Sequence, residues 1–311
     1  MREIVFEQFS FEGADGKGRR AAYIWHVEGE RPRAILQITH GMCEYIQRYD
    51  AWARRFVALG YLVCGHDHLG HGNSAEGEDA LGYTARRGGA EILVEDAHRM
   101  TQLMRERYPD VPIILYGHSM GSFVARAYLS RYGEELAGAL ISGTAGPGQP
   151  TGAGLLLTHA IAGVKGEQHR SKFLTSIAFG GYNKKFKGEP DAAAWLTRDT
   201  AVREAYEKDP FCHFVFTATG YDTLFSLLGE VSAKKWAQTV PKALPVLLFS
   251  GDMDPVGGYG KGVEKVYRRL CDAGCNVRLK LYKGGRHEMH NELNRDEVFA
   301  DLAAYLEEIL K

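Results

Sequence analysis

The fold is decided by residues 111–124, which read V-P-I-I-L-Y-G-H-S-M-G-S-F-V. The apolar run at 113–116 is typical of a buried strand, and a helical pattern begins directly after Gly121. The pattern G-x-S-x-G between a strand and a helix predicts a sharp turn with Ser119 at its tip. Gly117 and Gly121 leave room for that turn because neither carries a Cβ. We therefore predict that Ser119 is a nucleophile; the alternative is a strand–helix corner that happens to hold a serine.

The same turn predicts a place for negative charge. The helix starts directly after Ser119, so the Met120 N–H points to where an oxyanion would form on an attacked carbonyl. A second donor is expected just past the apolar strand at 34–39. Gly41 permits a close approach there, and we predict that the Met42 N–H is the second donor. The alternative for this segment is a plain turn at a strand end.

Composition limits the class of protein. A chain of 311 residues, 45% of them hydrophobic, can bury a large core as one domain with an insertion. The net charge of −1 does not suggest nucleic acid or an anionic membrane as a partner. Five cysteines without a metal-ligand pattern favour a cytoplasmic location. Residues 1–10 lack the features of a signal peptide, and no apolar segment approaches the ~18 residues of a transmembrane helix.

Strand and helix patterns alternate through the first 142 residues. The expected hairpin is at 4–11 and 20–27, the buried strands are at 34–39, 61–64, 113–116 and 136–142, and the helices are at 49–59, 89–107 and 122–132. This alternation predicts an α/β fold with a mostly parallel central sheet and helices on both faces.

The alternation stops at Gly143 and resumes only at Pro245. We expect a core of residues 1–144 and 241–311, with residues 145–240 inserted as a lid over the site. The apolar stretches of this inserted segment predict an acyl-binding pocket. The alternative is that these side chains only hold the lid to the core. The lid candidates for substrate binding are Leu155, Phe211, Phe214, Phe216, Tyr221 and Phe225.

The partners of the serine are sought after the last two strands. Asp252 is placed to stabilise the turn after the strand at 245–250, whereas Asp254 lies further out, before a proline. We therefore predict Asp254 as the orienting carboxylate. His287 directly follows a glycine turn, whereas His290 belongs to the start of the final helix, so we predict His287 as the base. The chain order Ser, Asp, His is that of α/β-hydrolases.

A second histidine cluster has the pattern H-x-H-x-x-H at His66, His68 and His71. Zinc hydrolases of the metallo-β-lactamase type have this spacing, but they place Asp directly before the third histidine, where this chain has Gly70. We therefore favour a polar loop, in which Asp67 and the histidines hydrogen-bond around the base of the active site, over a metal site.

These motifs together resemble the monoacylglycerol lipase and lysophospholipase group of α/β-hydrolases, which overlaps with the label "serine aminopeptidase". The motifs are H-G near Gly41, D-H-x-G-H-G-x-S at 67–74, G-H-S-M-G at the turn, G-D-x-D-P-V at 251–256 and G-x-x-H ending at His287. The resemblance extends from about Val5 to the C-terminus and is weakest in the lid. Many members continue the turn as G-x-S-x-G-G, where this chain has Ser122.

The resemblance implies that Ser119, Asp254 and His287 form a catalytic triad, with the Met42 and Met120 amides as oxyanion donors. It implies hydrolysis of lipid-like carboxylic esters, of the monoacylglycerol or lysophospholipid type, through an acyl-enzyme and without a metal or organic cofactor. The lid would set the substrate, and its apolar edge would contact a lipid surface transiently.

Other functions stay open at this point. A small-ester esterase would use the same triad, and a peptidase acting at a free N-terminus would need an acidic lid residue to hold the amine. The acidic candidates are Glu204, Glu207, Asp209 and Glu230. A zinc hydrolase and a non-catalytic binding protein are disfavoured. Dehalogenase and epoxide hydrolase chemistry is excluded because it requires a carboxylate where Ser119 stands. Chain length, head group and oligomeric state are left open.

Overall fold

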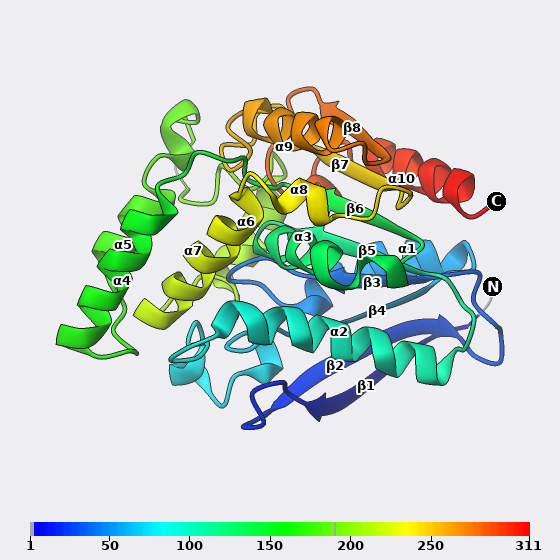
Figure 1. Cartoon of the computed structure of the whole chain (residues 1–311), viewed down its shortest axis with the longest axis horizontal. Helices are drawn as coiled ribbons and strands as arrows, with labels where there is room; N and C mark the ends of the chain where they lie inside the picture. The colour runs from blue at the N-terminus through cyan, green and yellow to red at the C-terminus, as the bar shows by residue number, and fades with distance from the viewer. Residues whose placement is uncertain (1–2, 190) are drawn as a thin grey trace.

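A single sheet forms the centre of the computed structural model, which describes residues 3–189 and 191–311. Its strand order is β1-β2-β4-β3-β5-β6-β7-β8 (Figure 1). The strands are β1 (Ile4–Glu12), β2 (Arg19–Val27), β3 (Ile35–Thr39), β4 (Leu62–His66), β5 (Ile113–His118), β6 (Gly138–Ser142), β7 (Val246–Gly251) and β8 (Val277–Tyr282). The β1–β2 and β2–β4 pairs are antiparallel, and the pairs from β3–β4 to β7–β8 are parallel. The predicted α/β fold is therefore confirmed.

Helices cover both faces of the sheet, as expected for parallel strands that are apolar on both sides. The helices are α1 (Asp50–Ala58), α2 (Gly89–Arg107), α3 (Met120–Tyr132), α4 (Thr151–Lys165), α5 (Lys172–Phe179), α6 (Thr200–Lys208), α7 (Ala218–Ser232), α8 (Trp236–Thr239), α9 (Lys261–Asp272) and α10 (Arg295–Ile309). Side chains of α2, α3 and α9 belong to one core cluster, and those of α1 and α10 belong to the other. Each face is thus a separate apolar layer.

The spacing of apolar residues explains how these helices attach. In α2 the buried residues include Leu93, Ala97, Met100 and Met104, which lie three or four positions apart and so share one face. In α9 the buried residues Val263, Val266 and Leu270 have the same spacing. Removing such a side chain from water contributes roughly 1.5–3 kcal/mol, so the stripes decide which side of each helix meets the sheet.

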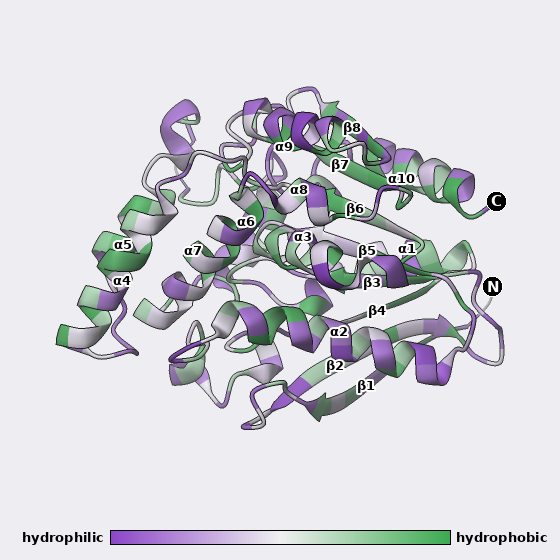
Figure 2. Cartoon of the chain, viewed as in Figure 1, coloured by the Kyte–Doolittle hydropathy of each residue, from purple (hydrophilic) through white to green (hydrophobic). Residues whose placement is uncertain are grey.

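The segment between β6 and β7 contains α4 to α8, and among its described residues there is no strand. Figure 2 shows apolar residues along α4 and α5 at the edge of the molecule. Buried Arg126 of α3 holds both ends of this segment, because it donates to the carbonyls of Ala145 (3.0 Å) and Val231 (2.6 Å). The division into a core and a lid at 145–240 stays a prediction, and residues 1, 2 and 190 of it lie outside the described residues.

The turn from β5 into α3 packs directly against the end of β3. A Cβ on Gly121 would overlap the carbonyl oxygens of Thr39 and His40, and the Thr39 hydroxyl donates to the Gly121 carbonyl at 2.9 Å. The backbones of α3 and β3 therefore approach as closely as they do only because position 121 is glycine.

We predict that Gly121→Ala lowers the free energy of unfolding by at least about 2 kcal/mol, because backbone atoms cannot move aside as a flexible side chain can. Gly163→Ala in α4 is the matched control. A Cβ there meets no atom within 4 Å, so it should raise stability by about 0.5–1 kcal/mol through helix propensity. Urea unfolding of both variants measures the difference; equal stabilities would contradict the packing argument.

Candidate active site

Ser119 lies at the tip of the β5–α3 turn, with φ 54° and ψ −120°. A positive φ is strained for a residue with a side chain, so neighbouring groups must hold it. The Ser119 N–H donates to the Ser142 carbonyl at 3.0 Å, and the Ser122 hydroxyl donates to the Ser119 carbonyl at 2.5 Å. Ser122 therefore supports the turn through its side chain.

Asp254 and His287 lie together beyond the ends of β7 and β8. His287 Nδ1 is 3.0 Å from Asp254 Oδ2, and since a carboxylate only accepts, Nδ1 carries the proton. Asp254 also accepts from the Ser250 hydroxyl (3.0 Å) and the Val256 N–H (2.9 Å). Asp252 instead accepts from the Gly284 N–H at 2.7 Å and stabilises the turn between the strands.

This arrangement leaves His287 Nε2 as a free acceptor. Nε2 is buried and has no partner among the described residues, and catalytic hydrogen bonds to a serine commonly tighten only once substrate is bound. Burial alone would lower the pKa of His287, but the charge and hydrogen bond of Asp254 raise it above its ordinary value. His290 packs elsewhere, buried and stacked on Tyr49 with ring centroids 4.5 Å apart.

The loop after β3 covers the nucleophile. A Cβ on Gly41 would lie 3.0 Å from Ser119 Cβ, which measures how closely this backbone passes. Within the described residues, no acceptor pairs with the N–H of Met42 or of Met120, the first residue of α3. The two amides predicted as oxyanion donors are thus unpaired among the described residues, one directly after Ser119 in the chain and the other in the loop that passes it.

A buried ionic network supports this loop from behind. Glu44 accepts from the Gly41 N–H, from the Tyr49 hydroxyl (2.9 Å) and from Arg48 (2.8 Å). Arg48 also makes a bidentate pair with Glu288 at 2.9 and 3.0 Å. Burial raises the pKa of Glu44 in spite of Arg48. Sequence reasoning missed this network, although Glu288 is the residue next to the predicted base.

The geometry agrees with comparisons to known proteins. A sequence model of the family "serine aminopeptidase, S33" matches residues 30–294. The chain belongs to this family. The resemblance to monoacylglycerol lipases predicted from the motifs is also confirmed, because relatives named monoacylglycerol lipase and monoglyceride lipase match 96% and 90% of this chain.

Three relatives of this S33 protein illustrate the match. A monoacylglycerol lipase of Mycolicibacterium smegmatis is 30% identical over 303 residues, with 96% of each chain covered. The monoglyceride lipase of Homo sapiens is 26% identical over 292 residues, covering 90% of this chain and 83% of the human one. The solved structure of a thermostable carboxyl esterase from Bacillus coagulans, in complex with glycerol, has a TM-score of 0.92 at 29% identity and covers 99% of each chain.

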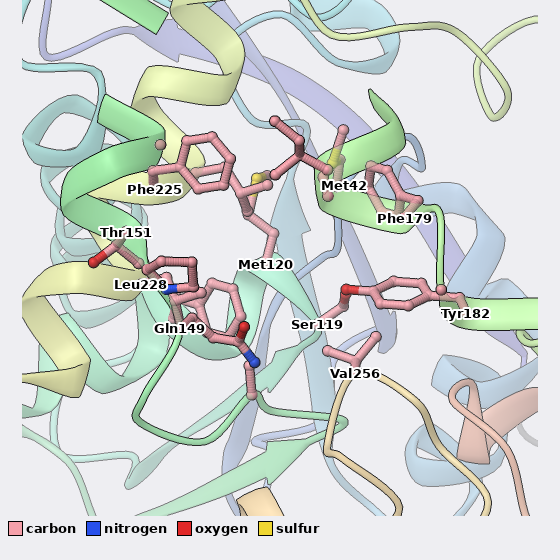
Figure 3. A pocket seen from close by; sticks show the side chains of 18 of the residues that line it. Met42, Ser119, Met120, Gln149, Thr151, Phe179, Tyr182, Phe225, Leu228 and Val256 are labelled. Carbon is pink, nitrogen blue, oxygen red and sulfur yellow. The ribbon is translucent and has the colours of Figure 1, made fainter. Parts of the chain in front are cut away.

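A cavity of about 480 Å³ opens above Ser119. Its walls come from α3, α4, α5 and α7 and from the loop after β3, and they are mostly apolar (Figure 3). The apolar side chains that line it include Phe123, Leu157, Ile177, Phe179, Leu224, Phe225 and Leu228. Helices α3, α4, α5 and α7 therefore form an apolar cavity on the nucleophile.

The structure corrects the lid residues predicted to line this cavity. Of the six candidates only Phe225 does so. Phe214 and Tyr221 line a neighbouring cavity of about 210 Å³, Phe216 is fully buried, and Leu155 and Phe211 lie outside both cavities. The residues that were missed, such as Leu157 and Leu228, alternate with the predicted ones along α4 and α7. Only the orientation of each helix decides which of them faces inward.

The histidines at the end of β4 and in the loop after it form a buried, largely uncharged layer. Asp67 accepts hydrogen bonds from the Ile46 and Asn73 amides and the Tyr23 hydroxyl, as a structural role predicts. The expectation that the histidines join these bonds is wrong for His66 and His68, whose ring nitrogens have no partner among the described residues. They pack by ring contact instead, 5.2 Å apart. Across the described ranges, no group of three or more His, Cys, Asp or Glu is placed to hold a metal.

Burial of these imidazoles predicts a dependence of stability on pH. Burial lowers the pKa of His66 to about 3, of His71 to about 4 and of His290 to about 3, and it lowers that of His40, His68 and His118 as well. In the unfolded chain a histidine titrates near pH 6.5. Below that pH the unfolded state therefore binds protons that the folded state does not, and stability falls.

At pH 5.5 each such histidine should reduce the free energy of unfolding by about 1.4 kcal/mol. Carboxylates with raised pKa, such as Glu44 and Asp67, oppose this loss, so a variant isolates the histidine contribution. We predict that His66→Met reduces the loss of stability between pH 7.5 and 5.5 by that amount in urea unfolding. An unchanged pH dependence would show that His66 is not neutral in the fold.

Proposed function

We propose that this protein hydrolyses carboxylic esters of lipid-like substrates, of the monoacylglycerol or lysophospholipid type, through an acyl-enzyme. The observation that carries the proposal is the apolar cavity of about 480 Å³ that ends on Ser119, because a serine nucleophile below an apolar cavity fits an ester with a long acyl chain. Relatives named monoacylglycerol lipase and carboxyl esterase support the same conclusion.

In the proposed mechanism His287 Nε2 takes the proton of Ser119 as its oxygen attacks the ester carbonyl. Asp254 holds the imidazole in the required tautomer and stabilises the imidazolium. The Met42 and Met120 amides bind the oxyanion, each contributing roughly 3 kcal/mol. His287 then protonates the leaving alcohol and activates the water that releases the acid.

The peptidase alternative loses support because its acidic group is missing from the cavity. Among the described lining residues there is no carboxylate. Glu204 pairs with Lys208, Asp209 accepts from Tyr45, and Glu230 pairs with Arg131; Glu207 lines the neighbouring cavity. A protonated amine above Ser119 would therefore have no buried counter-charge, which favours an uncharged ester.

We predict that Ser119→Ala abolishes labelling by a fluorophosphonate probe, since the probe reacts with the activated hydroxyl. Asp254→Asn should lower kcat for a p-nitrophenyl ester by about 10⁴-fold. An amide NH2 in place of Oδ2 would donate to Nδ1, which leaves the imidazole proton on Nε2 and removes the charge that stabilises the imidazolium. Asp252→Asn is the matched control and should keep near-normal turnover, since its amide oxygen can still accept from Gly284. Undiminished labelling of the alanine variant would refute the nucleophile.

Chain-length dependence tests the cavity. Each buried methylene contributes about 0.8 kcal/mol, so kcat/KM for p-nitrophenyl esters should rise about fourfold per methylene until the cavity is filled. Leu157 of α4 lines the cavity and its neighbour Leu156 does not. Leu157→Asn should flatten the dependence, whereas Leu156→Asn should leave it unchanged with these dissolved esters. Equal profiles for the two variants would contradict an acyl site between α4 and α7.

We also propose that the lid contacts lipid surfaces transiently. Leu156 and Val164 of α4 are 74% and 86% exposed, and Phe173 of α5 is 60% exposed; Ile177 of α5 is 48% exposed and also lines the cavity mouth. None of the helices in the described ranges has the length and apolar character of a membrane span. The cytoplasmic location stays a prediction.

Flotation with phosphatidylcholine vesicles tests this contact. We predict that the double variant Leu156→Asn, Phe173→Asn binds vesicles several-fold more weakly than the native protein, because two exposed apolar side chains are lost. The control Leu293→Asn removes a residue that is 62% exposed near α10 and should bind normally. Equal losses of vesicle binding in the double variant and in the control would show that binding depends on general surface hydrophobicity and not on the lid.

A further inference from the structure

Tyr182 is a polar residue of the lid that faces the nucleophile. It opens the short 3-10 helix Tyr182–Lys185, after α5, and lines the same cavity as Ser119. In Figure 3 its ring extends into the cavity with the hydroxyl toward Ser119. The other hydrogen-bonding side chains labelled there, Gln149 and Thr151, lie on the opposite side with Phe225 and Leu228.

The position of Tyr182 is set by contacts that reach the triad. The side-chain amide of Asn183 donates to the Ala192 carbonyl at 2.9 Å, and its oxygen accepts from the Trp195 N–H at 3.0 Å. The Tyr182 and Trp195 rings lie 4.9 Å apart, and the Trp195 ring lies 5.0 Å from that of His287. Tyr182 is therefore packed on the His287 side of the cavity, through one intervening ring.

The Tyr182 hydroxyl is an unused donor. Its ring packs on Phe179 and Trp195, but its hydroxyl makes no hydrogen bond within the described part of the chain. Burial and the Asp254 charge raise its pKa above the ordinary value, so the group is a neutral phenol that can donate and accept. The hydroxyl is open to the cavity and is not sealed in the core, so a bound molecule can reach it and supply the missing partner.

The polar atoms of the reacting ester already have partners. The carbonyl oxygen faces the Met42 and Met120 amides, and the alkoxy oxygen receives its proton from His287. The acyl chain has no polar atom to offer. The Tyr182 hydroxyl lies on the His287 side, where the leaving alcohol departs. Its remaining partner in the substrate is therefore a second oxygen of that alcohol.

We propose that the Tyr182 hydroxyl hydrogen-bonds a free hydroxyl on the alcohol part of the substrate, and so selects esters of polyols, such as monoacylglycerols, over esters of simple alcohols. The inference rests on the proposed ester hydrolysis and adds a specificity residue to it. A site built to bond a substrate hydroxyl discriminates against analogues that lack it, because its own polar group is then left unpaired.

The test compares 1-monooctanoylglycerol with methyl octanoate, which share one acyl chain. For Tyr182→Phe the ratio of kcat/KM values, glycerol ester over methyl ester, should fall about tenfold from the native ratio, through loss of turnover of the glycerol ester alone. Tyr267→Phe, the same change on α9 outside the cavity, should keep the native ratio. Fluorophosphonate labelling of Tyr182→Phe at the native rate shows that the triad is intact.

Two outcomes would overturn the role of Tyr182 while the ester hydrolase stands. One is an unchanged ratio in Tyr182→Phe, and the other is an equal loss with both esters, which would place its action on the reacting ester or on packing. Native protein that cleaves neither ester would contradict the proposed function itself, and with it this specificity.

Discussion

The backbone of Ser119, held at φ 54°, is the constraint on which the site depends. A left-handed conformation of this kind costs about 1–3 kcal/mol and persists only where its surroundings enforce it. Here the enforcing contact is the packing of Gly121 against the carbonyls of Thr39 and His40. That contact also fixes the distance between the nucleophile and the loop that follows β3. One close approach of two backbones therefore creates the turn and brings the Met42 amide beside it.

The loop after β3, which carries the Met42 amide, is also held in place from behind. His40 accepts the His68 N–H at Nε2 (2.9 Å), so its Nδ1 carries the proton toward the Gly41 carbonyl at 2.8 Å. Glu44 holds the Gly41 N–H from the other side. Both backbone groups of Gly41 are thus fixed, and the next amide, that of Met42, is oriented before substrate arrives. Preorganised donors of this kind stabilise an oxyanion without reorganisation during the reaction.

The sequence was sufficient to predict the sheet, most helices and the pairing of Asp254 with His287. These features depend on local patterns: apolar periodicity, glycine turns and the rule that parallel strands end at one edge. The cavity lining was predicted poorly because it depends on how each helix is rotated about its axis. Leu155 and Leu157 are the same residue type two positions apart, so they point to different faces of α4 and only Leu157 lines the cavity. Tyr182, Trp195 and the Glu44–Arg48–Glu288 network carry no local signal, since their contacts join residues far apart in the chain.

The most direct test of this account is a crystal structure of the protein with an octylphosphonate bound covalently to Ser119. The account predicts the phosphonyl oxygen about 2.7–3.1 Å from both the Met42 and Met120 nitrogens, His287 Nε2 within hydrogen-bonding distance of an ester oxygen on phosphorus, and the alkyl chain between α4 and α7. A phosphonyl oxygen directed to solvent, with the Met42 amide turned away, would contradict the claim that the turn and the loop form one preorganised site.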